Sequence, residues 1–465
     1  MFTQQFFIEG LGCASYFIAD EKTQTAAVID PDRDVQKYLD AANERGLKIT
    51  HIIETHLHAD HVSGNTELAA RLQAQGQAAN VYLPENSDAK FPHIALREGE
   101  TLTLGSLEFQ ILATPGHTPE SITLLIRDTA RGMEPALAFT GDTLFVGDVG
   151  RPDLVGADAA RKLAGEMYDS LQTKLLPLAD GLMIYPGHGA GSLCGRAMAT
   201  MRVSTLGYER HTNPALLPRT RDEFVIFNTT DLPEQPANNK RIKAMNRQGP
   251  RVLGEIVPRA LSVQQAVSHF QRGAGLLDTR AKPNYVARHI PGAVHLELND
   301  QLSNRVGVLL PPDAQVVLLL DDPADYTRVV YMLARVGFEN VAGYLENLEE
   351  WEARGYPVTS GDVQDIDARE LENRIANDAR VVVLDVREAW EFRNGHVPNA
   401  KLIPLGQLHT RYAELDPEMP TAVICQTGSR SQTAAALLAQ KGFKQIFNVR
   451  DGTAGWKQRG FPMEA

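Results

Sequence analysis

One stretch of the chain is unusually dense in imidazole and carboxylate groups. Such groups bind borderline transition metals such as zinc, iron and manganese. A polar loop that happens to be rich in histidine is the alternative reading, but later stretches offer partners of the same chemistry. The stretch runs from Thr55 to His61 and contains His56, His58, Asp60 and His61.

Three further candidate ligands follow at wide intervals. Each comes directly after a short apolar run and beside a glycine, where a strand would deliver a side chain to the edge of a sheet. One such residue alone would more often be an ordinary turn residue, but the recurrence of the pattern favours a shared metal site. The residues are His117, Asp142 and His188.

The segments around the histidine-rich stretch have regular periodicity. Residues 48–54 alternate and contain β-branched side chains, which predicts a strand. Residues 66–75 have helical spacing, with Asn65 or Thr66 as the expected N-cap. We expect short strands from there to His188, and a linker over residues 248–258.

The order of these residues resembles the metallo-β-lactamase superfamily, whose HxHxDH motif and later His, Asp and His are present over roughly residues 1–250. This resemblance implies an αββα sandwich. Residues 140–146 and 150–154, which include Arg151 and Asp153, resemble persulfide dioxygenases and glyoxalase II relatives within that superfamily.

The C-terminal part contains an internal repeat. Asp278 and Asp385 each lie eleven residues before a histidine, His289 and His396, and other motifs recur at matching distances. Two copies of about 100 residues predict two homologous domains, in which strands and helices alternate around a parallel sheet.

The second copy carries a candidate nucleophile, Cys425, between an apolar run and a helix. Backbone N–H groups of the turn and the positive end of the helix would hold an anion and favour the thiolate. A small buried residue at a strand end is the alternative. Cys425 to Arg430 resembles the CxxGxR loop of the rhodanese family, and Asp385, Arg387 and His396 match its upstream motifs.

The first copy departs from the rhodanese pattern. Leu320 occupies the position of Cys425, and Asp325 that of Arg430. An acidic loop without a thiol would repel an anionic sulfur compound, so this copy resembles an inactive rhodanese.

Together these features describe an α/β multidomain chain that resembles persulfide dioxygenase–rhodanese fusions. The expected domains are a metallo-β-lactamase-like domain over 1–250, an inactive rhodanese-like domain over 251–360 and an active rhodanese domain over 361–465. The resemblance implies one Fe(II) bound by His56, His117 and Asp142, and it leaves a second metal open. It places His58, Asp60, His61, His188, Arg151 and Asp153 around the iron, and makes Cys425, Arg430, Asp385 and Arg387 catalytic.

The implied reaction oxidises a small thiol persulfide, such as glutathione persulfide, with O₂ to sulfite and thiol, while Cys425 exchanges sulfur with thiosulfate or sulfite. A glyoxalase II-type thioester hydrolase with two metals is the alternative. Cys194 lies on a glycine-rich loop six residues after His188, where it would either relay sulfur or fill a tight loop. We interpret Cys13 as structural.

Composition narrows the remaining possibilities. The net charge of −12 disfavours nucleic acid as a partner. No apolar run approaches the roughly 18 residues of a membrane span, and the first residues show no signal-peptide pattern. Three cysteines argue against a disulfide framework and for the cytoplasm. The sequence leaves a homo-oligomer open.

Overall fold

The computed structural model describes residues 1–192, 194–196, 198–230, 232, 235, 238–361, 363–378 and 380–464. The chain forms two compact units. One comprises residues 1–255 with 334–337, and the other residues 256–333 with 338–465. The expected domain boundaries at 250 and 360 fall in segments that are neither helix nor strand.

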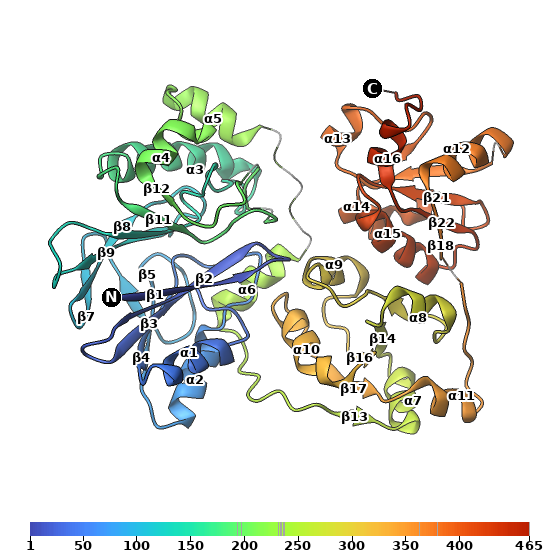
Figure 1. The fold of residues 1–465 in the computed structure, drawn as a ribbon, viewed down its shortest axis with the longest axis horizontal. Coiled ribbons are helices and arrows are strands. Elements are labelled where there is room, and N and C mark those ends of the chain that lie inside the picture. The colour runs from blue at the N-terminus through green and yellow to red at the C-terminus, as the bar shows by residue number, and fades with distance from the viewer. Residues whose placement is uncertain are drawn as a thin grey trace. The chain divides into compact units, whose positions relative to one another are not determined.

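The first unit is built on two six-stranded sheets (Figure 1). The first sheet has the order β1-β2-β3-β4-β5-β6, and the second β12-β11-β10-β9-β8-β7. Their strands are β1 (Phe2–Ile8), β2 (Cys13–Asp20), β3 (Thr25–Ile29), β4 (Lys48–Ile53), β5 (Asn80–Pro84), β6 (Ile94–Leu96), β7 (Thr101–Leu104), β8 (Leu107–Ala113), β9 (Ile122–Asp128), β10 (Leu137–Gly141), β11 (Met183–Pro186) and β12 (Ser204–Thr205).

Side-chain alternation along β2 shows how the layers are held together. Tyr16 and Ile18 join the core between the two sheets, whereas Phe17 and Ala19 pack with helices on the outer face. That face is covered by α1 (Gln36–Glu44) and α2 (Asn65–Ala74). Helices α3 (Ala157–Ser170) and α5 (Arg221–Thr229) cover the second sheet. The expected αββα sandwich is therefore confirmed.

Two local predictions are wrong. Between β10 and β11 the chain forms α3 instead of continuing in strands, because Leu163, Ala164 and Met167 recur at helical spacing and bury one face. The N-cap of α2 is Gly64, and Asn65 is the first helical residue, with its side-chain amide donating to the Glu54 carboxylate. The chain also forms helices α4 (Leu206–Thr212) and α6 (Asn239–Gln248) between His188 and the expected linker.

The second unit contains two five-stranded parallel sheets. Their orders are β13-β17-β16-β14-β15 and β18-β22-β21-β19-β20. When the strands are numbered from the first strand of each copy, the two orders are identical. This identity confirms the internal repeat. The strands are β13 (Ala260–Leu261), β14 (Gly275–Asp278), β15 (Val294–His295), β16 (Val316–Leu319), β17 (Val341–Leu345), β18 (Val363–Ile366), β19 (Val382–Asp385), β20 (Lys401–Leu402), β21 (Thr421–Ile424) and β22 (Ile446–Val449).

Helices alternate with these strands in both copies, as expected for parallel sheets. They are α7 (Val263–Gln271), α8 (Lys282–Ala287), α9 (Leu302–Leu309), α10 (Tyr326–Ala334), α11 (Leu348–Ala353), α12 (Ala368–Asn377), α13 (Ala389–Arg393), α14 (Leu405–Arg411), α15 (Ser429–Gln440) and α16 (Gly452–Gln458). Among the described residues, no helix combines the length and apolar character needed to span a membrane.

Candidate metal centre and sulfur-transfer loop

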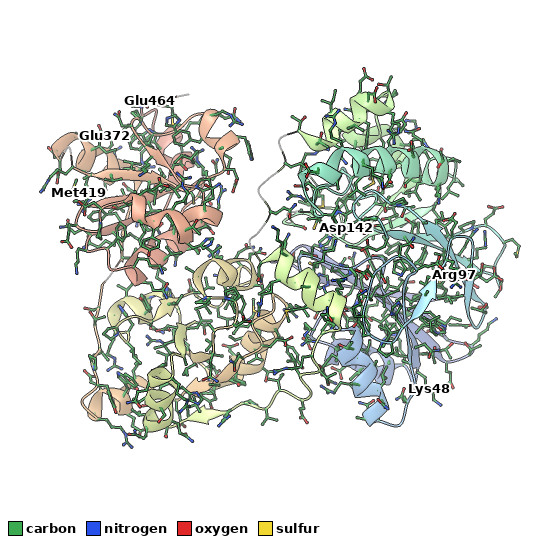
Figure 2. All side chains as sticks on the ribbon, turned by 180° about the vertical axis from the view of Figure 1, so that it is seen from behind. Lys48, Arg97, Asp142, Glu372, Met419 and Glu464 are labelled. Carbon is green, nitrogen blue, oxygen red and sulfur yellow. The ribbon has the colours of Figure 1, made fainter. Side chains whose placement is uncertain are left out.

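Four loops at the strand ends of the sandwich carry the predicted metal-site residues. The loop from β4 to α2 contains His56 and its neighbours, and His117 lies between β8 and β9. Asp142 follows β10, and His188 follows β11. Asp142 lies among the packed side chains of the first unit, whereas Lys48 and Arg97 are exposed (Figure 2).

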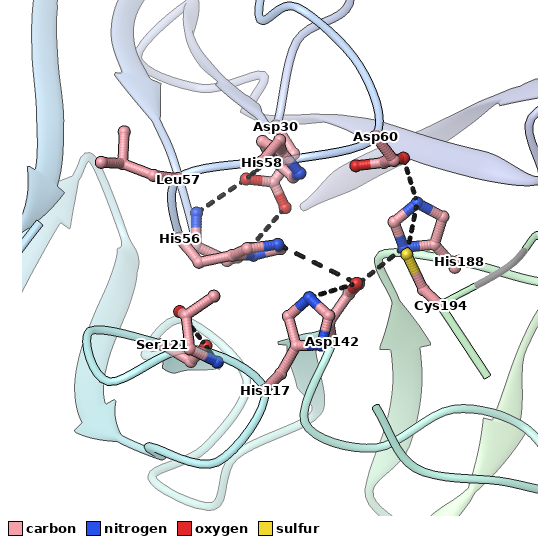
Figure 3. Close-up of polar contacts among 12 residues, drawn as sticks. Asp30, His56, Leu57, His58, Asp60, His117, Ser121, Asp142, His188 and Cys194 are labelled. Atoms are coloured by element: carbon pink, nitrogen blue, oxygen red, sulfur yellow. Dashed lines mark hydrogen bonds and ion pairs between the residues drawn. The ribbon is translucent and has the colours of Figure 1, made fainter. Parts of the chain in front are cut away.

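His56, His117 and Asp142 form a buried cluster with the geometry of a metal site. Each offers one ligand atom, and these atoms lie within 4.8 Å of one another. Asp142 Oδ2 lies 3.2 Å from His117 Nε2 and 3.9 Å from His56 Nε2. Asp142 Oδ2 and His56 Nε2 have no hydrogen-bond partner, although both are buried. Figure 3 shows the three side chains directed toward one another. Unpaired donor atoms of this kind fit a bound metal cation.

Hydrogen bonds on the far side of each imidazole fix which nitrogen faces the cluster. His117 Nδ1 donates to the Arg151 carbonyl at 2.9 Å. The Thr55 hydroxyl donates to Asp30, so it accepts from His56 Nδ1 at 3.0 Å. Both Nε2 atoms are then unprotonated, which is the form that binds metals. Burial also lowers the pKa of both imidazoles, His56 most strongly.

Glycine allows the Arg151 carbonyl to approach His117 so closely. A Cβ on Gly150 would lie 2.0 Å from the Asp142 carbonyl oxygen and 3.0 Å from His117 Nδ1. The Arg151 side chain forms a separate two-point ion pair with Asp153, at 2.7 and 2.8 Å. Arg151 therefore contacts the proposed ligand His117 through its backbone, and Asp153 lies one step further away.

His58 lies beside two carboxylates rather than in the three-residue cluster. Its Nε2 is 3.3 Å from Asp30 Oδ1 and 3.2 Å from Glu54 Oε2. All three side chains are at most 2% exposed. Burial alone would lower the pKa of His58, but the two carboxylates outweigh burial and raise it well above its usual value.

Asp60, His61 and His188 form another cluster with Cys13, in which Asp60 is partly exposed and the other three are buried. Asp60 Oδ2 contacts His188 Nε2 at 2.8 Å, Cys13 Sγ at 3.0 Å and His61 Nδ1 at 3.3 Å. His188 Nδ1 also pairs with Asp142 Oδ1 at 2.7 Å, so His188 connects the two clusters. Burial opposes ionisation of Asp142, but the nearby His188 and His117 keep its pKa low.

Cys194 lies next to this second cluster. Its Sγ is 4.0 Å from His188 Nε2, and the side chain is 5% exposed. The Cys194 carbonyl accepts a hydrogen bond from the Arg151 N–H at 2.9 Å. This bond joins the glycine-rich loop to the backbone segment whose carbonyl binds His117. Burial raises the pKa of this thiol, so it is protonated at neutral pH unless a base removes the proton.

The Cys425 loop leads from β21 into α15, as predicted. Cys425 is 1% exposed, and its Sγ lies 3.5 Å from Ser431 Oγ. Gly428 has φ of +86°, and a Cβ there would lie 2.1 Å from the Arg450 carbonyl oxygen, so the loop requires glycine. Arg430 Nη1 and Nη2 bind the Glu391 carboxylate at 2.7 and 2.8 Å. In the first copy, Leu320 follows the equivalent strand β16.

Several motif residues of the second copy make the same contacts in the first copy. Arg387 binds Asp385 through two nitrogens and donates to the Gly395 carbonyl. Arg280 binds Asp278 and the Arg288 carbonyl in the same way. Because the copy without a thiol retains the pair, these contacts support a scaffold role for Asp385 and Arg387.

Comparison with known families agrees with this architecture. Residues 8–188 match the model of the metallo-beta-lactamase superfamily, and residues 262–354 and 367–459 each match the rhodanese-like domain. The chain belongs to the metallo-beta-lactamase superfamily and carries two rhodanese-like domains after it.

The chain is similar to several individual members of this superfamily. It is 29% identical over 225 residues to mouse mitochondrial persulfide dioxygenase ETHE1, covering 47% of this chain and 78% of that protein. It is 33% identical over 213 residues to the hydroxyacylglutathione hydrolase GloC of Haemophilus influenzae, covering 42% and 89%. The crystal structure of a Staphylococcus aureus metallo-beta-lactamase superposes with a TM-score of 0.65 at 32% identity, covering 74% of this chain and 98% of that one.

Sequence reasoning missed Asp30 and Glu54, and it interpreted Cys13 as structural without its contact to Asp60. Asp30 and Glu54 each follow a strand directly, which is the signal that identified the other loop residues. Cys13 offered no local signal, since it reaches Asp60 across 47 residues of sequence.

Proposed function

We propose that the first unit is a mononuclear Fe(II) persulfide dioxygenase and that Cys425 is a sulfurtransferase nucleophile on the same chain. The observation that carries the first part is the convergence of His56 Nε2, His117 Nε2 and Asp142 Oδ2 in a buried site. Two histidines and one carboxylate are the ligand set of non-haem iron enzymes that use O₂.

The position of His58 supports one metal rather than two. A binuclear site would use this imidazole as a ligand, but its Nε2 lies 3.3 Å from Asp30 and 3.2 Å from Glu54, in a group of ligand atoms separate from the cluster of His56, His117 and Asp142. Those carboxylates are themselves anchored. Asp30 accepts from the Thr55 N–H and hydroxyl, and Glu54 accepts from Asn65 and Ser63. Moving His58 into the cluster would leave two buried carboxylates without a cation.

The proposed reaction is R–S–SH + O₂ + H₂O → R–SH + SO₃²⁻ + 2H⁺, with glutathione as the preferred R. When bound, Fe(II) would supply open positions at which O₂ and the terminal sulfur meet. The protein's part is orientation. The Arg151 carbonyl and Thr55 hydroxyl fix the two imidazoles, and His188 holds Asp142 through its second oxygen. The burial of all these groups keeps bulk water away.

At Cys425 the proposed step is Cys–S⁻ + S₂O₃²⁻ → Cys–S–S⁻ + SO₃²⁻. The thiolate forms a bond to the outer sulfur, and the S–S bond of thiosulfate breaks with its electron pair leaving on sulfite. A thiol acceptor then removes the sulfur as the persulfide that the first unit would oxidise. Run in reverse, the step converts sulfite into thiosulfate. Tethering the two sites on one chain raises their effective concentration.

O₂ consumption by the iron-loaded chain on addition of glutathione persulfide tests the proposal. His117→Ala should lose bound iron and O₂ uptake but keep thiosulfate sulfurtransferase activity, because that chemistry uses the second unit. His211→Ala, an exposed histidine on α4, is the matched control and should change neither. Loss of both activities in a folded His117→Ala protein would contradict separate sites.

A two-metal hydroxyacylglutathione hydrolase is the second candidate. Its support is the Cys13, Asp60, His61 and His188 cluster, which offers a second set of ligand atoms, and the similarity to GloC. Two metal equivalents with thioester hydrolysis and no O₂ uptake would favour it over the dioxygenase.

We further propose small sulfur compounds rather than nucleic acid or membrane as partners, and a cytoplasmic location. The net charge of −12 supports the first point. The three cysteines, all free, support the second.

A further inference from the structure

An arginine of the inactive copy contacts the sulfur-transfer loop of the active copy. Within the second unit, helix α9 of the first copy packs against α14 and α15 of the second. Arg305, on α9, donates from Nη2 to the Ser429 hydroxyl. Ser429 is the first residue of α15 and lies in the loop between Cys425 and Arg430.

Arg305 carries a charge that no carboxylate in the described part of the chain neutralises by direct contact. Its side chain is half-buried. Burial lowers its pKa, and the nearby Cys425 and Glu297 partly oppose that effect. A half-buried cation without a direct counterion favours an anion as its partner.

The arginine within the loop itself is in a different situation. Arg430 uses both terminal nitrogens on the Glu391 carboxylate, whose pKa Arg430 lowers although burial opposes ionisation. Its charge is thus already balanced by Glu391. A doubly charged sulfur oxyanion arriving at Cys425 needs a further cation, and among the described arginines Arg305 contacts this loop without a carboxylate partner.

We propose that Arg305 of the inactive copy is a specificity-determining residue of the Cys425 site, where it binds the sulfonate or sulfite group of the sulfur substrate. The first copy has lost its nucleophile and instead supplies a cation to its neighbour. This inference rests on the proposed sulfurtransferase function of Cys425. Arg305 contributes to binding the oxyanion of thiosulfate or sulfite and takes no part in breaking the S–S bond.

The test compares the full-length chain with Arg305→Gln and Arg305→Lys. Sulfur transfer to cyanide is measured with two donors, thiosulfate and glutathione persulfide, because only thiosulfate presents a sulfonate oxyanion. We expect Arg305→Gln to raise KM for thiosulfate by roughly tenfold, the scale of a charge-assisted hydrogen bond. KM for the persulfide should change much less, and Arg305→Lys should recover part of the loss.

Arg354→Gln is the matched control. Arg354 is an exposed arginine of the same copy, paired with Glu350 on its own helix at 2.8 Å. Its removal changes the net charge equally and should leave both donors unaffected. If Arg305→Gln slows both donors alike, or neither, the proposed oxyanion contact is wrong and Arg305 is only a packing residue.

A second measurement separates this proposal from the proposed function itself. Alkylation of Cys425 by anionic iodoacetate and by neutral iodoacetamide, followed by peptide mass analysis, needs no enzymatic turnover. Arg305→Gln should slow iodoacetate relative to iodoacetamide by a few-fold, and Arg354→Gln should not. An unchanged ratio overturns the role of Arg305 even in an active enzyme. If wild type transfers no sulfur, but the ratio of the two alkylation rates still differs between wild type and Arg305→Gln, the sulfurtransferase function is overturned and the Arg305 contact is not.

Discussion

His58→Ala provides a sharp test of whether the first unit binds one metal or two. In the structure this imidazole lies 3.3 Å from Asp30 and 3.2 Å from Glu54, and none of the three is more than 2% exposed. Removing one partner of a buried ion pair costs about 3–5 kcal/mol. Asp30 and Glu54 each keep other hydrogen-bond donors, so we expect about 3 kcal/mol, the lower end of that range.

The stability of the variant should depend on pH. Burial already raises the pKa of Glu54, an effect that His58 opposes. Without the imidazole the folded-state pKa rises further. A carboxyl group with a raised folded pKa contributes stability below its unfolded pKa, and this stability is lost as pH rises through the folded pKa. The free energy of unfolding of metal-free His58→Ala should therefore fall between pH 5 and pH 8, as measured by urea unfolding. In wild type the raised pKa of His58 makes stability fall over the same range, so the test is the pH dependence of the variant and not its difference from wild type.

Metal analysis of the same variant gives the functional answer. If His58 is not a ligand, His58→Ala should retain about one iron per chain, whereas His117→Ala should retain almost none. The reasoning is refuted if His58→Ala loses its metal as completely as His117→Ala does. If wild type binds two metal ions per chain and His58→Ala binds fewer, the reasoning is also refuted, and the binuclear hydrolase is favoured.

Three other substitutions test the sulfur chemistry. Cys425→Ser should abolish thiosulfate sulfurtransferase activity, because the first copy has Leu320 at the equivalent position; residual activity would show that the first copy is not inactive. The same variant should consume O₂ with preformed glutathione persulfide but not with thiosulfate plus glutathione, and product analysis should find sulfite without thiosulfate. Cys194→Ser should slow persulfide oxidation if Cys194 relays sulfur, and an unchanged rate and product would end that idea. Glu391→Gln should lower KM for thiosulfate by roughly threefold, because it frees the charge of Arg430; a raised KM would mean that the pair only positions the loop.

Much of the metal site could be predicted because its residues obey a local rule. His56, His117 and Asp142 each follow a strand, and strands of one sandwich end at a common rim, so strand-end position and chemistry marked them as candidate ligands together with other residues of the same loops. The choice of these three came from the family resemblance. The Cys425 loop was recognisable for a similar reason, since β21, the loop and α15 are adjacent in sequence.

The remaining contacts depend on long-range packing that no local pattern encodes. The position of His58 depends on Asp30, 28 residues earlier in the sequence. Arg305 contacts Ser429 across 124 residues and between two copies of the repeat. Asp385 and Arg387 were predicted to be catalytic because they match a motif, but a motif does not separate scaffold from chemistry. The matching pair in the first copy favours a scaffold role, and the catalytic role of Asp385 and Arg387 stays a prediction.

The shared strand order of the two repeats has a consequence for folding. Both sheets are parallel, and their central strands β16 and β21 occupy equivalent places, so a strand of one copy could enter the other sheet during folding. Mispairing between neighbouring homologous domains is a characteristic failure of tandem proteins. The central strands have diverged to VVLL and TAVI, which differ in side-chain volume and would pack poorly if exchanged. Making residues 421–424 identical to residues 316–319 should therefore lower the yield of correctly refolded chain, and the fold itself gives the two copies a reason to stay different in sequence.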